Sequence, residues 1–240
     1  ASRPFGMVNL NPDTEIKGDW GGGYKYTTDT VKGFSHVHEW QLSGISVMPV
    51  TITGENKAAI FKDFYSKFSH QTEIITPGYH LLKLDRYKIT AELTSTPRVG
   101  FHKYTFNSKE DAHVLLDLAD GVGWDSSKET FIKKTGKRTI VGYRYSNGWA
   151  ADQRLFFAME FSEDISNISL YDSTSVVNGT EWKALKMKAV LDFKTKTKNV
   201  IMVKVGLSPV SYDNALANIK AEIPHWDFTK SVQQADAKWN

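Results

Sequence analysis

The sequence predicts an all-β protein, built as a large antiparallel β-sandwich with helices near its carboxyl end. Apolar and polar residues alternate with a period of two through much of residues 80–207, as they do in strands that bury one face. Turn-forming clusters such as Thr76-Pro77-Gly78 and Ser146-Asn147-Gly148 separate these runs at short spacing. Few helical segments remain to make the crossovers of a parallel sheet, so we expect an antiparallel sandwich.

The clearest strands place apolar side chains on one face and polar side chains on the other. Their apolar faces are Tyr87, Ile89, Ala91 and Leu93 within Arg86–Thr94; Leu155, Phe157, Met159 and Phe161; Leu185, Met187, Ala189, Leu191 and Phe193; and Ile201, Val203, Val205 and Leu207. Weaker candidates are Val114–Leu118, Thr139–Tyr145 and Ile168–Tyr171.

The charge pattern excludes some classes of partner. The chain has 30 basic and 27 acidic residues, a net charge of +3, which is too small to indicate a nucleic-acid partner. The densest basic run, Lys133 to Arg138, contains Gly136 and no interleaved aromatic residue, so it predicts a solvated hairpin tip. No apolar run approaches the ~20 residues of a membrane span.

Residues 211–240 follow a helical pattern. The first predicted helix begins after Ser211, a suitable N-cap, and is interrupted by Pro224. After Asp227 a second amphipathic helix begins, and its apolar stripe still runs at Asn240. We therefore predict a sandwich domain over residues 1–210 and a helical linker towards another domain over residues 211–240.

The absence of cysteine excludes a disulfide framework and a thiolate metal site. The chain opens at Ala1-Ser2-Arg3-Pro4, with neither an initiator methionine nor a signal peptide, so we expect that an upstream segment has been removed.

Five blocks that cover nearly the whole chain carry a resemblance to a known family. They are Arg3-Pro4-Phe5-Gly6-Met7-Val8 with Leu10-Asn11-Pro12-Asp13-Thr14; Gly23-Tyr24-Lys25-Tyr26 with Gly33-Phe34-Ser35-His36 and His38; Pro77-Gly78-Tyr79 with Ala91-Glu92-Leu93-Thr94 and Arg98-Val99-Gly100-Phe101-His102-Lys103-Tyr104; Val203-Lys204-Val205-Gly206-Leu207-Ser208 with Val210-Ser211; and Trp226-Asp227-Phe228. In this order they resemble the amino-terminal domain of glycoside hydrolase family 92, the calcium-dependent α-mannosidases.

The resemblance implies a supersandwich of the mutarotase-like kind, linker helices and an (α/α)6 catalytic barrel that lies outside this chain. It also implies an exo-acting enzyme that cleaves α-mannosides of glycans with inversion, in an extracytoplasmic location: periplasmic, cell-surface or secreted. The catalytic carboxylates and the ligands of Ca2+ belong to the barrel, so we expect neither catalytic residues nor metal ligands here, and no activity from this chain alone. Without its barrel, the domain should expose a large apolar patch near Trp20 and His38 and along residues 228–239.

The predicted substrate-binding residues are Trp20, His38, Glu39 and Trp40. Sugar sites combine an aromatic platform with convergent hydrogen-bonding groups. Trp20 precedes a glycine run in a segment without strand periodicity, and the resemblance implies that it covers the sugar; the alternative is a tryptophan that plugs the sandwich end. His38, Glu39 and Trp40 either complete that site or form a buried network against the barrel. Many family members read His-Leu-Ser-Gly-Thr-Gly from this histidine onward, so the linkage specificity does not carry over.

The predicted supporting residues are Arg3, Phe5, His36 and Arg98, placed at the interface with the barrel. His36 and His38 would share one face of a strand, as two metal ligands could, but no third ligand follows a recognisable pattern and no zinc site is expected.

Two other functions remain open. A free-standing carbohydrate-binding module is the main alternative, because sandwiches often present aromatic residues to glycans. A mutarotase-like enzyme would need a histidine acid and a carboxylate base across one sugar. His38 and Glu39 are adjacent in sequence and would point to opposite faces of a strand, which disfavours that chemistry.

Overall fold

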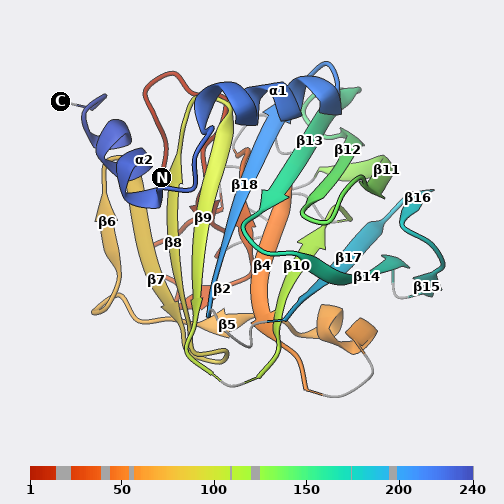
Figure 1. Ribbon diagram of the computed structural model, residues 1–240, viewed down its shortest axis with the longest axis horizontal. Helices are drawn as coiled ribbons and strands as arrows, with labels where there is room; N and C mark the ends of the chain where they lie inside the picture. The colour runs from red at the N-terminus through yellow and green to blue at the C-terminus, as the bar shows by residue number, and fades with distance from the viewer. Residues whose placement is uncertain are drawn as a thin grey trace.

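Two large antiparallel sheets face each other in the part of the chain that the computed structural model describes (Figure 1). This part comprises residues 1–14, 23–38, 44–53, 57–108, 110–119, 125–173, 175–194 and 199–239. Strand pairs in both sheets are antiparallel, as the alternation predicts.

The larger sheet contains nine described strands in the order β16-β11-β12-β13-β18-β9-β8-β7-β6. Their bounds are β6 Ile74–Thr76, β7 Tyr79–Leu84, β8 Ile89–Ser95, β9 Val99–Phe106, β11 Ser126–Lys134, β12 Thr139–Asn147, β13 Gln153–Phe161, β16 Glu181–Ala184 and β18 Val200–Ser208.

The second sheet contains seven described strands in the order β1-β3-β4-β10-β17-β14-β15. Their bounds are β1 Asn11–Pro12, β3 Phe34–Ser35, β4 Ser46–Thr51, β10 Ala112–Asp117, β14 Ile165–Asp172, β15 Ser175–Val177 and β17 Met187–Phe193. A short pair, β2 Thr30–Val31 with β5 Ser66–Lys67, and a 3-10 helix, η2 Lys57–Lys62, complete the strand-rich part.

The main core lies between the two sheets. Leu82 and Ile89 of the larger sheet belong to the same buried cluster as Val114 and Leu191 of the smaller one. These residues come from the apolar faces of the predicted strands, so burial of one face per strand explains the period-two pattern.

Two helices cover part of the outer face of the larger sheet, and these are α1 Tyr212–Glu222 and α2 Phe228–Asp236 (Figure 1). α1 packs on β18 and β13, and Ile219 joins a second buried cluster with Phe101 and Ala158. The approach is close at Gly206, where an added Cβ would collide with the carbonyl oxygen of Ala215. The outer face is therefore apolar where the helices lie.

The predicted strands are confirmed, with corrected ends. The run Arg86–Thr94 becomes β8 only from Ile89, because residues 85–88 form a turn in which Lys88 has a φ of 53°. Leu185 precedes β17 and is 51% exposed, so it does not belong to that strand's buried face. The basic run around Gly136 forms the tip between β11 and β12, as predicted.

The helix starts are also confirmed. The hydroxyl of Ser211 accepts a hydrogen bond from the amide of Asn214 at 3.1 Å, and the carboxylate of Asp227 accepts one from Lys230 at 2.9 Å. The expectation that the second helix runs to the chain's last residues is wrong, because α2 ends at Asp236.

The predicted apolar patch is wrong where the structure describes it. Phe228 and Ala235 are buried on the sheet, and His38 is 7% exposed. The face of α2 that was expected to be free packs against β7 and β8. Trp239 is 47% exposed, and its indole donates to the carbonyl oxygen of Ser2 at 2.9 Å.

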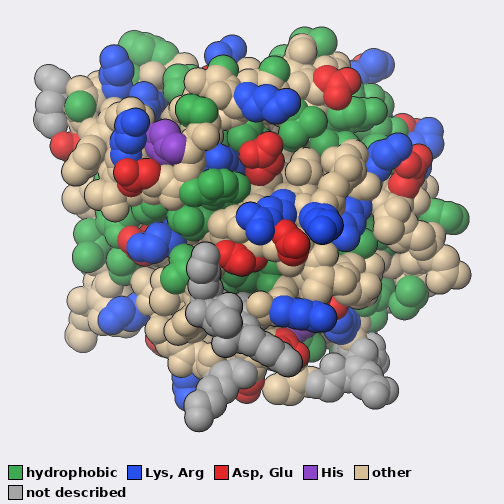
Figure 2. Space-filling view, in the orientation of Figure 1, with side chains coloured by type: hydrophobic (Ala, Val, Ile, Leu, Met, Phe, Trp, Pro, Cys, Tyr) green, Lys and Arg blue, Asp and Glu red, His purple; other side chains and the backbone are tan. Residues whose placement is uncertain are grey.

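The surface carries mixed charge. Figure 2 shows basic and acidic side chains interspersed over the visible face, which agrees with the small net charge of +3. Among the described segments, neither α1 nor α2 has the length and hydrophobicity that a bilayer-crossing helix requires.

Candidate functional site

A closed polar cluster surrounds Asp13, directly after β1. Nε2 of His38 lies 2.9 Å from Oδ1 of Asp13, and the Ser35 hydroxyl donates to Oδ2 of the same carboxylate. Nδ1 of His38 lies 2.8 Å from the carbonyl oxygen of Asn9. A carbonyl can only accept, so Nδ1 of His38 donates to Asn9, and a second hydrogen bond joins Nε2 to the carboxylate of Asp13.

The cluster lacks the geometry of a nucleophilic triad. In such a triad the histidine bridges the serine and the carboxylate, so that it can take the serine's proton. Here Asp13 is the central group, and the hydroxyl of Ser35 bonds to the carboxylate instead of to the ring of His38. The arrangement can position chain segments, but it does not activate Ser35.

Local pairing brings these side chains together. β1 pairs with β3 in the register Asn11 with Ser35, and the amide of Asp13 donates to the carbonyl oxygen of Gly33 at 2.8 Å. Gly23 packs against the cluster so closely that an added Cβ would collide with Oδ1 of Asp13. A residue with a side chain at position 23 would displace this ion pair.

The cluster holds the ends of two chain segments that carry predicted site residues. The amide of Thr14 donates to the carbonyl oxygen of Gly23 at 2.6 Å, which joins the two ends of residues 15–22. His38 directly precedes residues 39–43, and it bonds to Asp13, the neighbour of Thr14. Both segments therefore start from one place on the sandwich.

The residues that flank a third segment, residues 120–124, lie at the same end of the smaller sheet as Asp13 and His38. β4 and β10 pair with Ser46 opposite Asp117, so residues that follow β10 lie beside residues that precede β4. The buried guanidinium of Arg144 donates to the carbonyl oxygen of Leu118 at 2.9 Å and to the carboxylate of Asp125, which fixes the two sides of residues 120–124.

The predicted substrate-binding residues are only partly described. Trp20, Glu39 and Trp40 lie outside the described residues. His38 is described, and both of its ring nitrogens have protein partners, while its side chain is 2% exposed. Its predicted contact with a sugar stays a prediction, and the geometry gives it a role in positioning the two segments.

His36 belongs to a second, fully buried network. Its Nδ1 lies 2.7 Å from the carbonyl oxygen of Ile45, its Nε2 lies 2.8 Å from Nε2 of His102, and the hydroxyl of Tyr104 lies 2.7 Å from Nδ1 of His102. Burial lowers the pKa of His36 to about 4 and the pKa of His102 well below 6.5, so both rings are neutral at pH 7.

Arg3 and Arg98 bind other parts of this chain. Arg3 donates to the carbonyl oxygen of Ser95 at 3.2 Å. The guanidinium of Arg98 donates to Glu222 at 2.6 Å, and Thr96 also donates to that carboxylate at 2.5 Å. Arg98 thus fastens the end of α1 to the turn between β8 and β9.

Phe5 is the most exposed of the predicted supporting residues. Its relative exposure is 107%, and its φ of 57° lies in the left-handed region that non-glycine residues seldom adopt. An aromatic ring that is held outward at a conformational cost is expected to have a contact surface, and no described residue supplies one.

Sequence reasoning missed Asp13 and Ser35 as partners of His38. Both lie in the blocks that carried the resemblance, and the carboxylate of Asp13 close to the predicted histidines could have indicated a hydrogen-bond partner for His38. It also missed Glu73, whose side chain is 3% exposed and contacts His70, His80 and Tyr24. Nothing in the spacing of these residues indicates that they meet.

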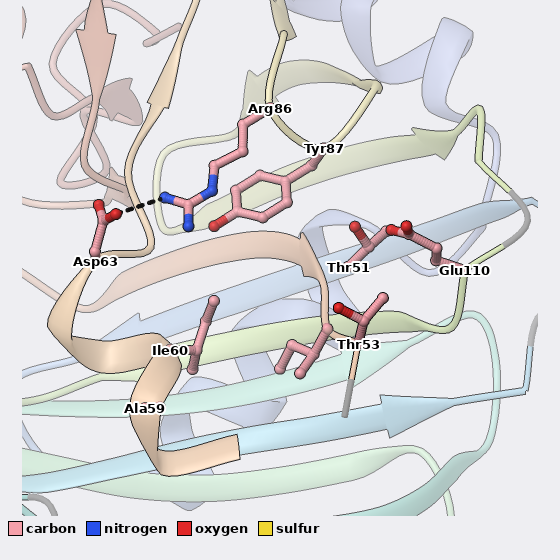
Figure 3. A pocket seen from close by; sticks show the side chains of 9 residues that line it. Thr51, Thr53, Ala59, Ile60, Asp63, Arg86, Tyr87 and Glu110 are labelled. Carbon is pink, nitrogen blue, oxygen red and sulfur yellow. Dashed lines mark ion pairs between the residues drawn. The ribbon is translucent and has the colours of Figure 1, made fainter. Parts of the chain in front are cut away.

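A cavity of about 410 Å³ lies at the Thr51 end of β4, and Figure 3 shows the side chains that line it. Arg86 and Asp63 form an ion pair across it at 3.2 Å. Tyr87 is the aromatic ring among the described lining residues; it is 4% exposed and its hydroxyl donates to the carbonyl oxygen of Phe64. The cavity lacks an available ring face, so it is a weak candidate for sugar binding.

No group of three or more potential His, Cys, Asp or Glu ligands converges among the described residues. The predicted Ca2+ was assigned to the barrel, so it stays a prediction.

Comparison with known proteins identifies the family. Residues 1–208 match the glycosyl hydrolase family 92 N-terminal domain. The chain belongs to this family. Its described strands and helices fit the family's fold, since the chain superposes on a family GH92 α-mannosidase from Bacteroides thetaiotaomicron with a TM-score of 0.88 and 25% identity.

Other relatives agree with this assignment. A family GH92 inverting mannosidase from Bacteroides thetaiotaomicron has a TM-score of 0.83 and 24% identity, over 99% of this chain and 32% of its own. An uncharacterized secreted glycosidase from Arthroderma benhamiae is 26% identical over 100% of this chain and 35% of its own length. The match to the α-mannosidase covers 99% of this chain and 34% of the α-mannosidase. This family 92 domain thus spans about a third of the relatives that it matches.

Proposed function

We propose that this family 92 domain is part of an exo-acting, inverting α-mannosidase, to which it supplies one side of the glycone site and a scaffold for the catalytic barrel. Trp20, Glu39 and Trp40 contact the mannose in this proposal, and His38 positions them. The barrel supplies the carboxylates and binds the Ca2+ that engages the sugar. The protein acts on mannose-containing glycans outside the cytoplasm.

The cluster of Asp13 and His38 is the observation that carries the proposal. It brings together the described residues that flank both segments, since Thr14 bonds to Gly23 and Asp13 bonds to His38, and the segments with Trp20, Glu39 and Trp40 begin at these residues. A sugar site needs such convergence, because the platform and the polar groups must reach one ring.

The relatives support the substrate class and the location. The α-mannosidase of Bacteroides thetaiotaomicron has also been solved with mannoimidazole. The Arthroderma benhamiae relative is described as secreted. A scaffold role is supported by Phe5, whose outward ring suits a contact with another domain.

The test uses the longer protein that the proposal implies, with turnover of a mannoside and melting temperature measured on each variant. Trp20→Ala should lower kcat/KM about a hundredfold without unfolding the protein, because a misplaced sugar loses its alignment with the catalytic acid. Glu39→Ala should act similarly and change which linkage is preferred. His38→Ala should lower the melting temperature as well as turnover, because it leaves the buried carboxylate of Asp13 without its histidine partner. Trp182→Ala, which removes an exposed tryptophan from β16, is the matched control and should leave turnover unchanged.

The opposite pattern would support a purely structural role. If these variants lose thermal stability while the folded enzyme turns over normally, the residues only fill an interface. The 240-residue chain alone should not hydrolyse mannosides, and calcium-dependent mannosidase activity in it would overturn the division of labour.

A free-standing carbohydrate-binding module would need an open aromatic platform. The aromatic row on the outer face of β11–β13 does not supply one, because Tyr143 stacks between Phe131 at 5.3 Å and Tyr145 at 4.4 Å. The guanidinium of Arg154 also lies over the ring of Tyr145, 5.3 Å from its centroid. These ring faces are already occupied, so this row does not favour the module.

A further inference from the structure

A cavity of about 590 Å³ lies beside Tyr26, next to the cluster of Asp13 and His38. Its size falls within the range of small-molecule sites, roughly 300–1,000 Å³. Hydroxyl groups dominate the described lining, and they come from Thr14, Tyr26, Thr27, Thr28 and Thr30. Hydroxyls both donate and accept, which suits a ligand that is itself rimmed by hydroxyls.

Tyr26 offers the aromatic face that the cavity beside Tyr87 lacks in its described lining. One face of its ring lies against His70, with ring centroids 4.3 Å apart and an interplanar angle of 33°. The side chain is nevertheless 69% exposed, so the opposite face is available to a ligand. A pyranose ring has an apolar C–H face that packs on such a surface.

His70 fixes this platform in place. Its Nδ1 lies 2.6 Å from Glu73 and its Nε2 lies 3.0 Å from the carbonyl oxygen of Thr28, so both nitrogens donate. Glu73 also accepts from the hydroxyl of Tyr24 at 3.0 Å and lies 2.6 Å from Nε2 of His80. The hydrogen bond to Glu73 raises the pKa of His70. Because both nitrogens of His70 are hydrogen-bonded, its ring is held in place and supports the ring of Tyr26 that lies against it. An aromatic ring that is already oriented lowers the entropic cost of binding.

Two of the three charged groups in the described lining, Asp29 and His70, are paired with opposite charges, which leaves the threonine and tyrosine hydroxyls as the main groups for a ligand. Asp29 lies 2.8 Å from Lys67, and the ammonium of Lys32 lies over the ring of Tyr65. His70 is neutralised by Glu73. Lys32 keeps its charge, because a tyrosine ring does not neutralise an ammonium, and its amine can also donate to a sugar hydroxyl.

The position of Thr14 links this cavity to the proposed glycone site. Thr14 lines the cavity, follows Asp13 directly and bonds to Gly23 at the far end of residues 15–22. A ligand in the cavity would therefore lie close to the base of the segment that carries Trp20.

We propose that this cavity is a second carbohydrate subsite, which binds a further pyranose of the same glycan on the free face of Tyr26. The identity of the ligand as a mannose-containing glycan rests on the proposed function. The hydroxyl of Thr27 can donate or accept at the sugar's rim, whereas the hydroxyl of Thr28 already donates to the carbonyl oxygen of Lys25 at 2.9 Å and therefore accepts from the sugar. The subsite adds affinity for an oligosaccharide over a single mannose.

The test titrates the 240-residue chain with methyl α-mannoside and with an α-linked mannotriose, by calorimetry and by amide chemical shifts. Tyr26→Ala should weaken mannotriose binding about tenfold, whereas Tyr26→Phe keeps the ring face and should keep the affinity within about twofold. Because Tyr26 is exposed, both variants should retain the wild-type melting temperature. The amides of Thr27 and Thr28 should shift with mannotriose.

The outcomes separate this subsite from the proposed function. If Trp20→Ala removes mannoside binding while Tyr26→Ala leaves mannotriose affinity unchanged, the subsite is wrong and the proposed function stands. If Tyr26→Ala removes mannotriose binding while Trp20→Ala leaves turnover by the longer protein unchanged, the subsite stands and the glycone site is wrong. If the wild-type chain shows no Tyr26-dependent binding of mannotriose at its solubility limit, the subsite is overturned.

Discussion

At the scale of single residues, the direction of every hydrogen bond in the chain of Tyr104, His102 and His36 follows from its last acceptor. The carbonyl oxygen of Ile45 can only accept, so Nδ1 of His36 donates and its Nε2 accepts from His102. Nδ1 of His102 then accepts from the hydroxyl of Tyr104. Protonation of His36 would leave two donors facing each other in a dry interior, and protonation of His102 would take the acceptor away from the hydroxyl of Tyr104, which agrees with the lowered pKa values.

This network predicts a loss of stability in acid. The pKa of His36 falls from 6.5 in the unfolded chain to about 4 in the folded one, so below pH 6.5 the unfolded state binds the extra proton. The free energy of unfolding should decrease as the pH falls through this window, by about 2 kcal/mol for His36 alone between pH 7 and pH 5. Urea unfolding at pH 7, 6 and 5 measures the decrease.

A double variant provides the control for this dependence. His36→Leu with His102→Leu removes both buried rings, so its unfolding free energy should change less between pH 7 and pH 5, even where it is less stable at pH 7. An equal pH dependence in the variant and the wild type would place the acid sensitivity elsewhere.

The sequence predicted His36 as a supporting residue but could not predict its partner. His102 lies 66 residues away, and the two rings meet because β9 crosses opposite β3 in the other sheet. The same holds for Asp13 and His38, which are 25 residues apart. Contacts of this kind depend on strand register and sheet packing, which a local pattern does not encode.

At the scale of elements, the period-two pattern was enough to find the long strands, because each buries one face. It failed at their ends: Leu185 continues the alternation of β17 but lies outside the strand. The helix starts were predictable because Ser211 and Asp227 cap them locally. The burial of α2 was not predictable from the sequence, since the outward-facing residues of β7 and β8 follow the alternation expected of a strand with one solvent-exposed face.

The attachment of α1 to the sheet yields a prediction about Glu222. Its side chain is 11% exposed and accepts from the hydroxyl of Thr96, from the amide of Arg98 and from the guanidinium of Arg98. Glu222→Ala should lower the unfolding free energy by about 2 kcal/mol, because it leaves the hydroxyl and the amide without their acceptor.

Arg98→Ala is the matched comparison. The side chain of Arg98 is 54% exposed, so solvent screens its ion pair, and the loss should be below about 1 kcal/mol. Urea denaturation of the two variants gives both values. A larger loss for Arg98→Ala than for Glu222→Ala would mean that the ion pair, and not the hydrogen bonds to Thr96 and the backbone, holds the helix.

At the scale of the whole molecule, the fold class and the family were predictable because they rest on features distributed over the entire chain. The substrate site stays a prediction, because Trp20, Glu39 and Trp40 lie outside the described residues. The structure adds the place where the segments that carry them start, which is the cluster of Asp13, Ser35 and His38. It also shows that the helices pack on the sandwich, so the apolar surface that remains for another domain is smaller than expected.

Substitutions of Phe5 test whether another domain covers the surface around its ring. In the 240-residue chain its ring is fully exposed, so Phe5→Ala should change the unfolding free energy by less than about 0.5 kcal/mol. In the longer protein of the proposal, the same ring would be buried at the contact with the barrel. Its removal there should cost about 2–3 kcal/mol and lower the melting temperature, because a buried aromatic contact is lost.

The glycine variant at the same position separates the ring from the backbone. The φ of 57° costs Phe5 conformational energy, so Phe5→Gly should stabilise the 240-residue chain slightly compared with Phe5→Ala, whose Cβ keeps the strain. Both variants should destabilise the longer protein, since both lack the ring. If wild type, Phe5→Ala and Phe5→Gly differ in the longer protein only as little as they do in the 240-residue chain, Phe5 stays in solvent there, and the interface would have to lie on another face of the sandwich.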